Sequence, residues 1–432
     1  MIQVIKNGTV VTMDEKRQKK YEKLDIVIED DTIKEITDSY TGLYDTLIDA
    51  TGKIVLPGLI NCHTHLGMSI FRATNDDYQL QDWLTKKIWP IEDHMTDEDI
   101  YYTTLLSCLE MIKTGTTTSN DMYFGVQGSL KAIEEAKVRS VFSRCLMGNM
   151  DSSSLDRIEE FKKLVLDNQE KELLTFTVTP HSMYTCNEEY LKECEKVASE
   201  LHLPIHIHYS ENEKEVEGII HDYGMSPASA LEKIGYLNHK LILAHGTFIS
   251  EEDQQLLSKY DVSIATNPIS NLNLGCGIAD LVKYKKNGIN ICLGTDGQGS
   301  GNTLNMFYHM SVVDQLQKAK YKDPTVFNSY EVLKMATING AKALGLEEKI
   351  GSIEKGKKAD IIILDLHNIE IYPTVDLINQ IVHNVESSNV DTTMVNGCVL
   401  MKNHQLNLPI DEEQLKKDIN SIIYRLMPKS EN

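Results

Sequence analysis

Histidines spaced one residue apart are the residues of this sequence best suited to chemistry. His63-Thr64-His65 ends an apolar run, and His206-Ile207-His208 repeats the spacing. Side chains two apart in a β-strand point to the same side, so each pair presents two imidazoles together. Two imidazoles that converge at the end of a buried strand favour a metal site. For one pair alone, hydrogen-bonded core histidines are the alternative.

The alternation of apolar and helical segments along the chain predicts the elements that hold these histidines. From residue 57 onward, apolar strand candidates alternate with helical patterns such as 97–113, 128–137, 155–168, 188–201 and 251–259. Eight such strands predict an α/β protein with a (β/α)8 barrel. A doubly wound sheet shares the alternation, but its Gly-x-Gly-x-x-Gly turn is missing. The strand candidates are 54–62, 116–120, 140–146, 174–179, 204–208, 241–245, 262–266 and 289–294.

Short strands at both chain ends predict a second, smaller unit. They are expected at 3–5, 9–13, 25–29, 32–36, 47–49, 359–364, 390–395 and 397–401, with turns at Asn7-Gly8, Asp30-Asp31 and Asn396-Gly397. We expect residues 1–56 and 353–432 to form one small β-sandwich domain of antiparallel strands. The barrel, residues 57–352, would be inserted between them.

Two helices are expected beyond the eighth strand. One spans about 329–344. The other spans 411–426, where Leu415, Ile419, Ile422 and Leu426 share one face, which predicts a helix packed on the surface.

Polar residues fall where the predicted barrel strands end. Strand one ends at His63 and His65, strand four at His181, strand five at His208, strand six at His245 and strand eight at Asp296. Catalytic residues of such barrels sit at these carboxyl ends. Any one of them has packing or a turn as an alternative explanation. Their occurrence at corresponding ends of successive strands indicates a functional site.

Three imidazoles and one carboxylate form the predicted metal site. His208 lies one layer nearer the barrel mouth than His206, so His208 is the expected ligand and His206 a packing or supporting residue. Together with His63, His65 and Asp296 it suits one zinc ion and leaves room for water. Iron(II) and manganese(II) accept the same ligands. A metal lowers the pKa of bound water from about 15.7 towards ~7, which supplies hydroxide at neutral pH.

Composition narrows the class of partner. The formal net charge of −21 argues against nucleic acid, because phosphate binding needs clustered Lys and Arg. No stretch approaches ~18 uninterrupted apolar residues, so no membrane span is expected. The start of the chain has no apolar secretory segment. The eight cysteines form no Cys-x-x-Cys pair, which predicts reduced thiols in a cytoplasmic protein. The sequence does not set the oligomeric state, although soluble enzymes of this kind are often symmetric homo-oligomers.

Several motifs resemble those of the amidohydrolase superfamily. They are Pro57-Gly58-Leu59-Ile60-Asn61-Cys62-His63-Thr64-His65, His206-Ile207-His208, Ala244-His245-Gly246 and Gly294-Thr295-Asp296. Segments 89–92, 180–186, 208–211 and 267–271 are most similar to the 5-methylthioadenosine/S-adenosylhomocysteine deaminase family. The resemblance covers essentially the whole chain. Binuclear members end strand four with a carboxylated lysine, and His181 stands there in this sequence, so one metal is expected.

The resemblance implies a hydrolytic deaminase. The adenine of S-adenosylhomocysteine, 5-methylthioadenosine or a related adenosine would become hypoxanthine, with release of ammonia. Asp296 would take a proton from the metal-bound water, Glu211 would donate one to purine N1, and His245 would orient the hydroxide. Glu211 is singled out because it lies three residues beyond His208, and a raised pKa is expected for it. The alternative for Glu211 is a solvated loop carboxylate.

Substrate contacts follow from the same resemblance. Glu92 would accept the ribose hydroxyls, and His181 would approach the ribose or the purine edge. Arg144 and Arg157 resemble residues that face the amino-acid tail of the substrate, and surface ion pairs are the alternative for both.

Two rival functions stay open from the sequence. One is a related deaminase of guanine, an oxidised purine or a triazine, for which Glu92 would have no ribose to hold. The other is a catalytically silent metal-binding scaffold. Silent relatives usually lack a ligand or an acid, whereas every residue that the chemistry requires is present here.

Overall fold

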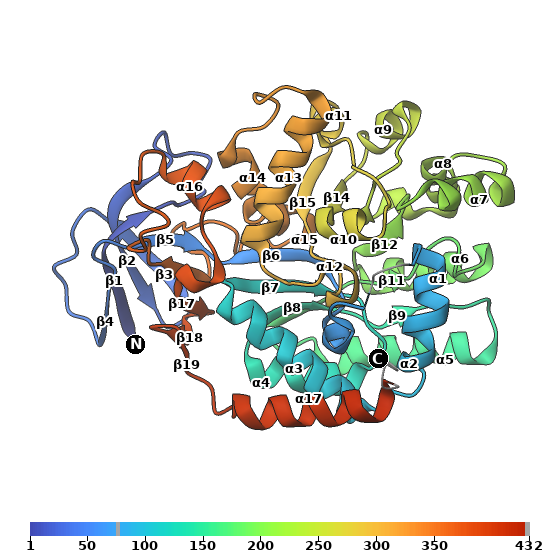
Figure 1. The fold of residues 1–432 in the computed structure, drawn as a ribbon, viewed down its shortest axis with the longest axis horizontal. Coiled ribbons are helices and arrows are strands. Elements are labelled where there is room, and N and C mark those ends of the chain that lie inside the picture. The colour runs from blue at the N-terminus through green and yellow to red at the C-terminus, as the bar shows by residue number, and fades with distance from the viewer. Residues whose placement is uncertain (75–77, 428–432) are drawn as a thin grey trace.

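A core of parallel strands wrapped by helices makes up most of the molecule. The structure is a computed structural model that describes residues 1–74 and 78–427. One four-stranded parallel sheet has the order β10-β8-β7-β6, and another has the order β12-β13-β14-β15. These strands are β6 (Leu59–Thr64), β7 (Thr116–Asp121), β8 (Arg139–Phe142), β10 (Leu174–Phe176), β12 (Ile205–Tyr209), β13 (Leu241–His245), β14 (Val262–Thr266) and β15 (Asn290–Leu293). Helices lie around them (Figure 1).

The two sheets meet along both edges. The short parallel pair β9 (Cys145–Leu146) and β11 (Thr179–Pro180) extends the first sheet towards β12, where Val178 bridges to Ile205 and Ser182 to His208. At the other edge, the Thr295 and Asp296 amides donate to His63 O over 3.1 and 3.0 Å. Within the described ranges no continuous ladder closes these strands into a barrel. The mixed α/β class is as predicted.

Helices follow the strands along the chain. They are η1 (Leu66–Phe71), α1 (Leu80–Trp83), η2 (Leu84–Ile88), α2 (Trp89–Glu92), α3 (Asp97–Lys113), α4 (Val126–Ala136), α5 (Ser152–Asn168), α6 (Glu188–Leu201), α7 (Glu213–Tyr223), α8 (Pro227–Ile234), η3 (Tyr236–Asn238), α9 (Glu251–Leu257), α10 (Pro268–Asn273), α11 (Leu281–Lys286), α12 (Gln298–Gly301) and α13 (Met306–Tyr321). The first turn of α3 is closed by a capping box of Thr96 and Asp99. No helix in the described part of the chain is long and apolar enough to span a bilayer.

Two predicted elements are each divided in the structure. The single strand expected over 54–62 is wrong, because the chain leaves one sheet at Gly58 and enters another. A β-carbon at Gly58 would lie 2.1 Å from the Thr117 hydroxyl oxygen, so this close crossing requires glycine. The helix expected over 329–344 is two helices, α14 (Ser329–Met335) and α15 (Ile338–Leu344). Between them Thr337 is not helical, and the carbonyl of Ala336 accepts from the Ile60 amide of β6.

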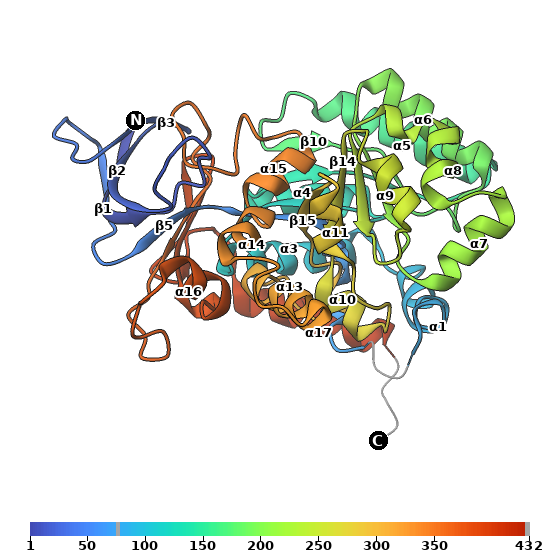
Figure 2. The same cartoon turned by 90° about the horizontal axis from the view of Figure 1, so that it is seen from above.

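Both ends of the chain contribute to one nine-stranded sheet (Figure 2). Its order is β19-β18-β17-β16-β5-β1-β2-β3, with β4 paired to β1. The strands are β1 (Ile2–Val10), β2 (Glu22–Glu29), β3 (Thr32–Thr37), β4 (Thr46–Asp49), β5 (Ile54–Pro57), β16 (Ile361–Leu364), β17 (Val390–Val395), β18 (Cys398–Lys402) and β19 (Gln405–Leu406). Between β16 and β18 lie α16 (Leu377–His383) and η4 (Ser387–Asn389).

The strand pairing of this sheet differs from the prediction in two ways. Its strands are hydrogen-bonded into one continuous sheet around an apolar cluster of its own. β1 pairs in parallel with β4 and β5, so the sheet is not purely antiparallel. Asn7-Gly8 is a bulge inside β1 and not a turn, since Asn7 has a φ of 66° and the register shifts there. The hairpins at Asp30-Asp31 and Asn396-Gly397 are confirmed.

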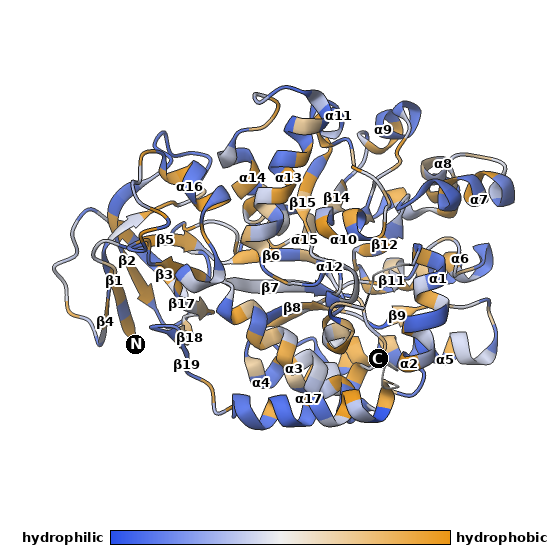
Figure 3. Cartoon of the chain, in the orientation of Figure 1, coloured by the Kyte–Doolittle hydropathy of each residue, from blue (hydrophilic) through white to orange (hydrophobic). Residues whose placement is uncertain are grey.

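The last described helix, α17 (Glu412–Leu426), lies along α3 (Figure 1). Leu415, Ile419 and Ile422 are buried, as the apolar face predicted. In Figure 3 most of the remaining surface of α17 is hydrophilic. Arg425 pairs with Asp99 and Lys113 with Glu412, so ion pairs bind the helix to α3 of the α/β part of the molecule.

Candidate metal centre and active site

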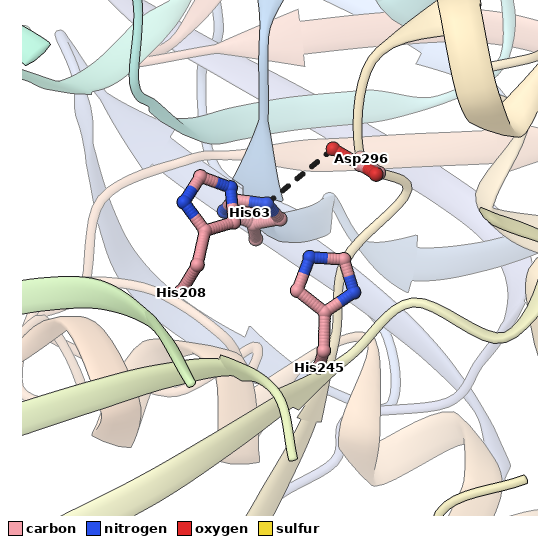
Figure 4. Close-up of side chains that lie close together, drawn as sticks. All are labelled: His63, His208, His245 and Asp296. Atoms are coloured by element: carbon pink, nitrogen blue, oxygen red, sulfur yellow. Dashed lines mark ion pairs between the residues drawn. The ribbon is translucent and has the colours of Figure 1, made fainter. Parts of the chain in front are cut away.

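The predicted site residues converge where the parallel strands end. His63, His208, His245 and Asp296 each offer one ligand atom, and these atoms lie within 4.8 Å of one another (Figure 4). His65 belongs to the same cluster, since its Nε2 lies 3.0 Å from Asp296 Oδ1 and 3.3 Å from His208 Nε2. The structure therefore adds His245, predicted as a catalytic residue, to the group from which a metal would take its ligands.

Strained backbone helps to aim two of these side chains. His245 and Asp296 have φ values of 73° and 60°, in the left-handed region that costs a residue with a β-carbon about 1 kcal/mol. Just before Asp296, a β-carbon at Gly294 would lie 2.3 Å from Asn267 Oδ1 and 2.9 Å from the β-carbon of His63. Glycine at this position lets the end of β15 approach β6, which brings Asp296 to the histidines.

Every imidazole of the cluster is held through its Nδ1 atom, which leaves Nε2 facing the centre. The Nδ1 partners are His206 Nε2 at 2.9 Å for His63, Met122 O at 2.6 Å for His65, His181 O at 2.7 Å for His208, and Asn271 Oδ1 at 2.8 Å for His245. A partner on the second ring nitrogen orients an imidazole and fixes its tautomer for metal binding. His63 Nε2 is buried and makes no hydrogen bond to the residues that the structure describes.

The electrostatics of the cluster favour a cation. Burial lowers the pKa of His63 to about 3 and that of His208 well below its ordinary value, so both rings are neutral and can donate a lone pair. Burial opposes the charge of Asp296, but the imidazoles of His63 and His65 hold the pKa of this carboxyl well below its ordinary range. Although burial acts against it, the Asp296 carboxylate raises the pKa of His65 to about 9. Without a metal, the protonated ring of His65 balances the negative charge of Asp296. A divalent cation at the centre supplies that positive charge instead.

Two serine hydroxyls fix the orientation of Asp296. Ser270 Oγ and Ser300 Oγ donate to Oδ2 over 2.6 and 2.7 Å, and the Gly297 amide donates to Oδ1 over 2.9 Å. Sequence reasoning did not assign these serines. Ser270 and Asn271 both lie in the segment 267–271, which was noted only for its resemblance.

Glu211 lies beside the cluster. It is buried, and burial raises the pKa of its carboxyl, as expected for a proton donor. Glu211 Oε1 lies 3.7 Å from His245 Nδ1, and the Cys276 thiol donates to the same oxygen over 3.8 Å. The solvated loop carboxylate is therefore excluded for this residue.

A pocket opens onto the cluster. Polar residues that line it are His65, His208, His245, Asp296 and Glu211, and apolar ones include Leu80, Trp83, Leu84, Ile88 and Trp89. Glu92 and His181 also line it. Tyr123 donates to Glu92 Oε1 over 2.8 Å, and burial raises the pKa of Glu92 to about 7. Burial lowers the pKa of His181 to about 3, so this ring is neutral.

The two arginines border a neighbouring cavity that shares Trp89, Glu92, Phe124 and Cys145 with the first. Arg144 Nε donates to Glu160 Oε2 over 2.6 Å, so its charge is paired. Arg157 donates to the carbonyl of Met147 over 2.6 Å. No ion pair of Arg157 is found with a carboxylate of the described chain.

Comparison with known families now bears on this site. The sequence pattern of the amidohydrolase family matches residues 54–400, which include every member of the metal cluster. The chain belongs to the amidohydrolase family.

Two curated relatives of this amidohydrolase match nearly its whole length. A 5-methylthioadenosine/S-adenosylhomocysteine deaminase of Thermoanaerobacter pseudethanolicus is 40% identical over 433 residues, which cover 99% of this chain and 98% of the relative. A 5'-deoxyadenosine deaminase of Methanosarcina acetivorans is 37% identical over 435 residues, 99% of each chain. The resemblance read from the sequence motifs is thereby confirmed.

A solved structure matches this amidohydrolase as well. It is a zinc-bound adenosine deaminase from Xanthomonas campestris, 27% identical, with a TM-score of 0.94 over 98% of each chain. Its agreement in fold spans both the parallel strands and the nine-stranded sheet.

Proposed function

We propose that this amidohydrolase deaminates adenosine-type nucleosides by hydrolysis. The 6-amino group of adenine in S-adenosylhomocysteine, 5-methylthioadenosine or a related adenosine is replaced by oxygen, and ammonia leaves. The observation that carries the proposal is a single pocket lined by the histidine and aspartate cluster together with Glu211, Glu92 and His181. The names of the curated relatives support the adenosine class of substrate.

The proposal includes a (β/α)8 barrel. The eight parallel strands form it, with an interrupted ladder between β15 and β6. In that description residues 57–352 form the barrel, and residues 1–56 and 353–432 form the small β domain. The site then lies at the carboxyl ends of the strands, where barrels of this type place their catalytic residues.

One divalent metal, most simply zinc, is assigned to His63, His65, His208 and Asp296. Three neutral imidazoles and one carboxylate are a ligand set that zinc prefers, and iron(II) or manganese(II) also fit it. The buried Nε2 of His63 and the low pKa of the Asp296 carboxyl agree with this assignment. When bound, the metal supplies hydroxide at neutral pH by lowering the pKa of a water molecule.

The protein side chains move the protons. Asp296 accepts a proton from the attacking water, and the Ser270 hydroxyl on Oδ2 keeps the carboxylate oriented for this. Glu211 delivers a proton to purine N1 as the water oxygen adds to C6, and its raised pKa keeps the proton available. His245 steadies the tetrahedral centre as an electrostatic partner. A proton from Asp296 then lets the amine leave as ammonia, and the proton of the new C6 hydroxyl returns to Glu211, so that water and adenine give hypoxanthine and ammonia.

Other residues that line the pocket hold the substrate. Glu92, positioned by Tyr123, accepts the ribose hydroxyls, and His181 contacts the ribose or the purine edge. Arg157 and Arg144 face the 5′ tail in the adjoining cavity. Because Arg144 is paired with Glu160, Arg157 has the charge that is freer to meet a tail carboxylate.

Ammonia release from zinc-loaded protein tests the proposal. The substrates are S-adenosylhomocysteine, 5-methylthioadenosine, adenosine, free adenine, guanine and a triazine. Turnover of the ribosylated adenines alone supports it and ranks the 5′ tails. Turnover of a free base alone would keep the metal chemistry and overturn the roles of Glu92, Arg144 and Arg157. Zinc retained without ammonia release from any purine would point to a silent scaffold.

A further inference from the structure

Glu215 is a buried acid that does not line the catalytic pocket. It is the third residue of α7 and 5% exposed. It lines a different groove, together with its neighbours Lys214 and Gly218. Because Glu215 is not among the residues that line the catalytic pocket, it does not contact a substrate bound there. Any role in the reaction must pass through other residues.

The carboxylate of Glu215 binds two consecutive backbone amides. Oε1 accepts from Ser210 N over 3.0 Å, and Oε2 accepts from Glu211 N over 2.8 Å. In α3 and α14 the acid at the same helical position accepts from the capping residue itself. In α7 the capping residue is Asn212, which accepts from the Glu215 amide, and the Glu215 side chain reaches past it. It thus binds the two residues that precede the cap.

The turn bound in this way carries the proton donor. Ser210 has a φ of 48°, and its carbonyl accepts from the Thr247 and Phe248 amides over 2.9 and 3.0 Å. The same turn is therefore tied to the loop that follows His245. In contrast, among the residues that the structure describes, the polar contacts of the Glu211 carboxylate are the long ones to His245 Nδ1 and Cys276 Sγ. Its position depends mainly on where the backbone places it.

We propose that Glu215 is a positioning residue for the proton donor. By holding the Ser210 and Glu211 amides together, its carboxylate fixes the strained turn and so fixes the Glu211 side chain beside the histidine and aspartate cluster. The inference rests on the proposed function, in which Glu211 delivers the proton to the substrate.

The variant E215Q tests the proposal. Glutamine keeps the size, but only its carbonyl oxygen can accept, and its NH₂ group faces the second amide. Misplacement of a catalytic group by about 1 Å costs on the order of 10²-fold in rate, so kcat should fall about 30- to 100-fold. KM should change less than about 3-fold, because Glu215 does not touch the substrate. The matched control is E217Q, the same substitution at an exposed position of α7.

A double-variant cycle separates this role from a general structural one. If Glu215 acts only through Glu211, E215Q should lower the residual rate of an E211Q enzyme by less than about 2-fold. An equal loss in both backgrounds, or a normal kcat for E215Q beside an impaired E211Q, would overturn the positioning role. A fully active E211Q would instead overturn the proposed function. If E215Q does not fold, E215D is measured in the same way, since its shorter side chain cannot span both amides.

Discussion

At the residue scale, the site is a set of four imidazoles arranged around one strongly acidic carboxyl. Five side chains compete for four ligand positions, because both His65 and His245 turn their Nε2 atoms inward. His65 Nε2 lies 3.0 Å from Asp296 Oδ1, whereas His245 Nδ1 lies 3.7 Å from Glu211 Oε1. On these contacts we propose His65 as the metal ligand and His245 as a partner of the reacting centre.

Removal of each histidine should therefore have a different effect. After zinc loading and desalting, H65A should lose most of its metal, since three ligands bind zinc more weakly than four. H245A should keep about one equivalent per chain and lose turnover. Metal content by mass spectrometry decides between them, with H221A at an exposed surface position as the control. Loss of metal from H245A together with retention by H65A would reverse the assignment.

The pH dependence of activity should follow Glu211. Burial raises the pKa of this carboxyl, so the free enzyme keeps the required proton to a higher pH than an ordinary glutamate. Because the protonated form is the active one, kcat/KM should fall as the pH rises through that raised pKa. This alkaline limb should be missing in E211Q, whose rate should drop about 10²–10⁴-fold. An unchanged alkaline limb in E211Q would assign the titration to another group.

At the element scale, strand ends and helix starts carry the functional side chains, and outer helices stabilise them. The turn between β12 and α7 presents Glu211, and α17 covers α3 from the far end of the chain. The helix α3, against which α17 packs, in turn contacts β7.

Truncation of this face should destabilise the protein. The substitution I419A removes a buried side chain of α17 and should cost about 2–4 kcal/mol of unfolding free energy, because it leaves a cavity against the helix interface. Urea unfolding followed by circular dichroism measures the loss. K417A, at an exposed position of the same helix, should stay within about 0.5 kcal/mol of the parent. A similar small effect for I419A would mean that α17 detaches at little cost.

At the scale of the whole molecule, a buried ion pair joins the nine-stranded sheet to the parallel strands. Arg139 of β8 donates to both carboxylate oxygens of Asp360, from Nε over 2.8 Å and from a terminal nitrogen over 3.0 Å. Both side chains are nearly inaccessible. The Gly58 amide donates to the carbonyl of Asp360, so the crossing between the sheets is held at the same point.

Removal of one partner should therefore be costly. D360A leaves the Arg139 guanidinium buried without its carboxylate and should lower the free energy of unfolding by about 3–5 kcal/mol. The exposed pair Lys34 and Glu29 provides the control, since K34A should cost less than about 1 kcal/mol. Equal losses of unfolding free energy for the two substitutions in urea would show that the buried pair stabilises the protein no more than an exposed one.

The histidine spacing, the periodicity of the strands and the turn dipeptides are local properties. The features of the protein that depend on these local properties were determined by the sequence alone. His63, His65, His208 and Asp296 were identified because a residue at the end of a parallel strand is near the ends of its neighbours. The hairpin at Asn396-Gly397 and the apolar face of α17 follow from local patterns in the same way.

The tertiary structure decided what depends on close approach between distant segments. The strand over 54–62 divides because Gly58 passes against Thr117, and the helix over 329–344 breaks because Ile60 takes the carbonyl of Ala336. Sequence periodicity does not predict the hydrogen bonds of the serines to Asp296, of the thiol to Glu211, or of Glu215 to two backbone amides. Such hydrogen bonds join residues that are far apart in the chain or lie on both sides of a turn. They form only where tertiary packing fixes the course of the backbone.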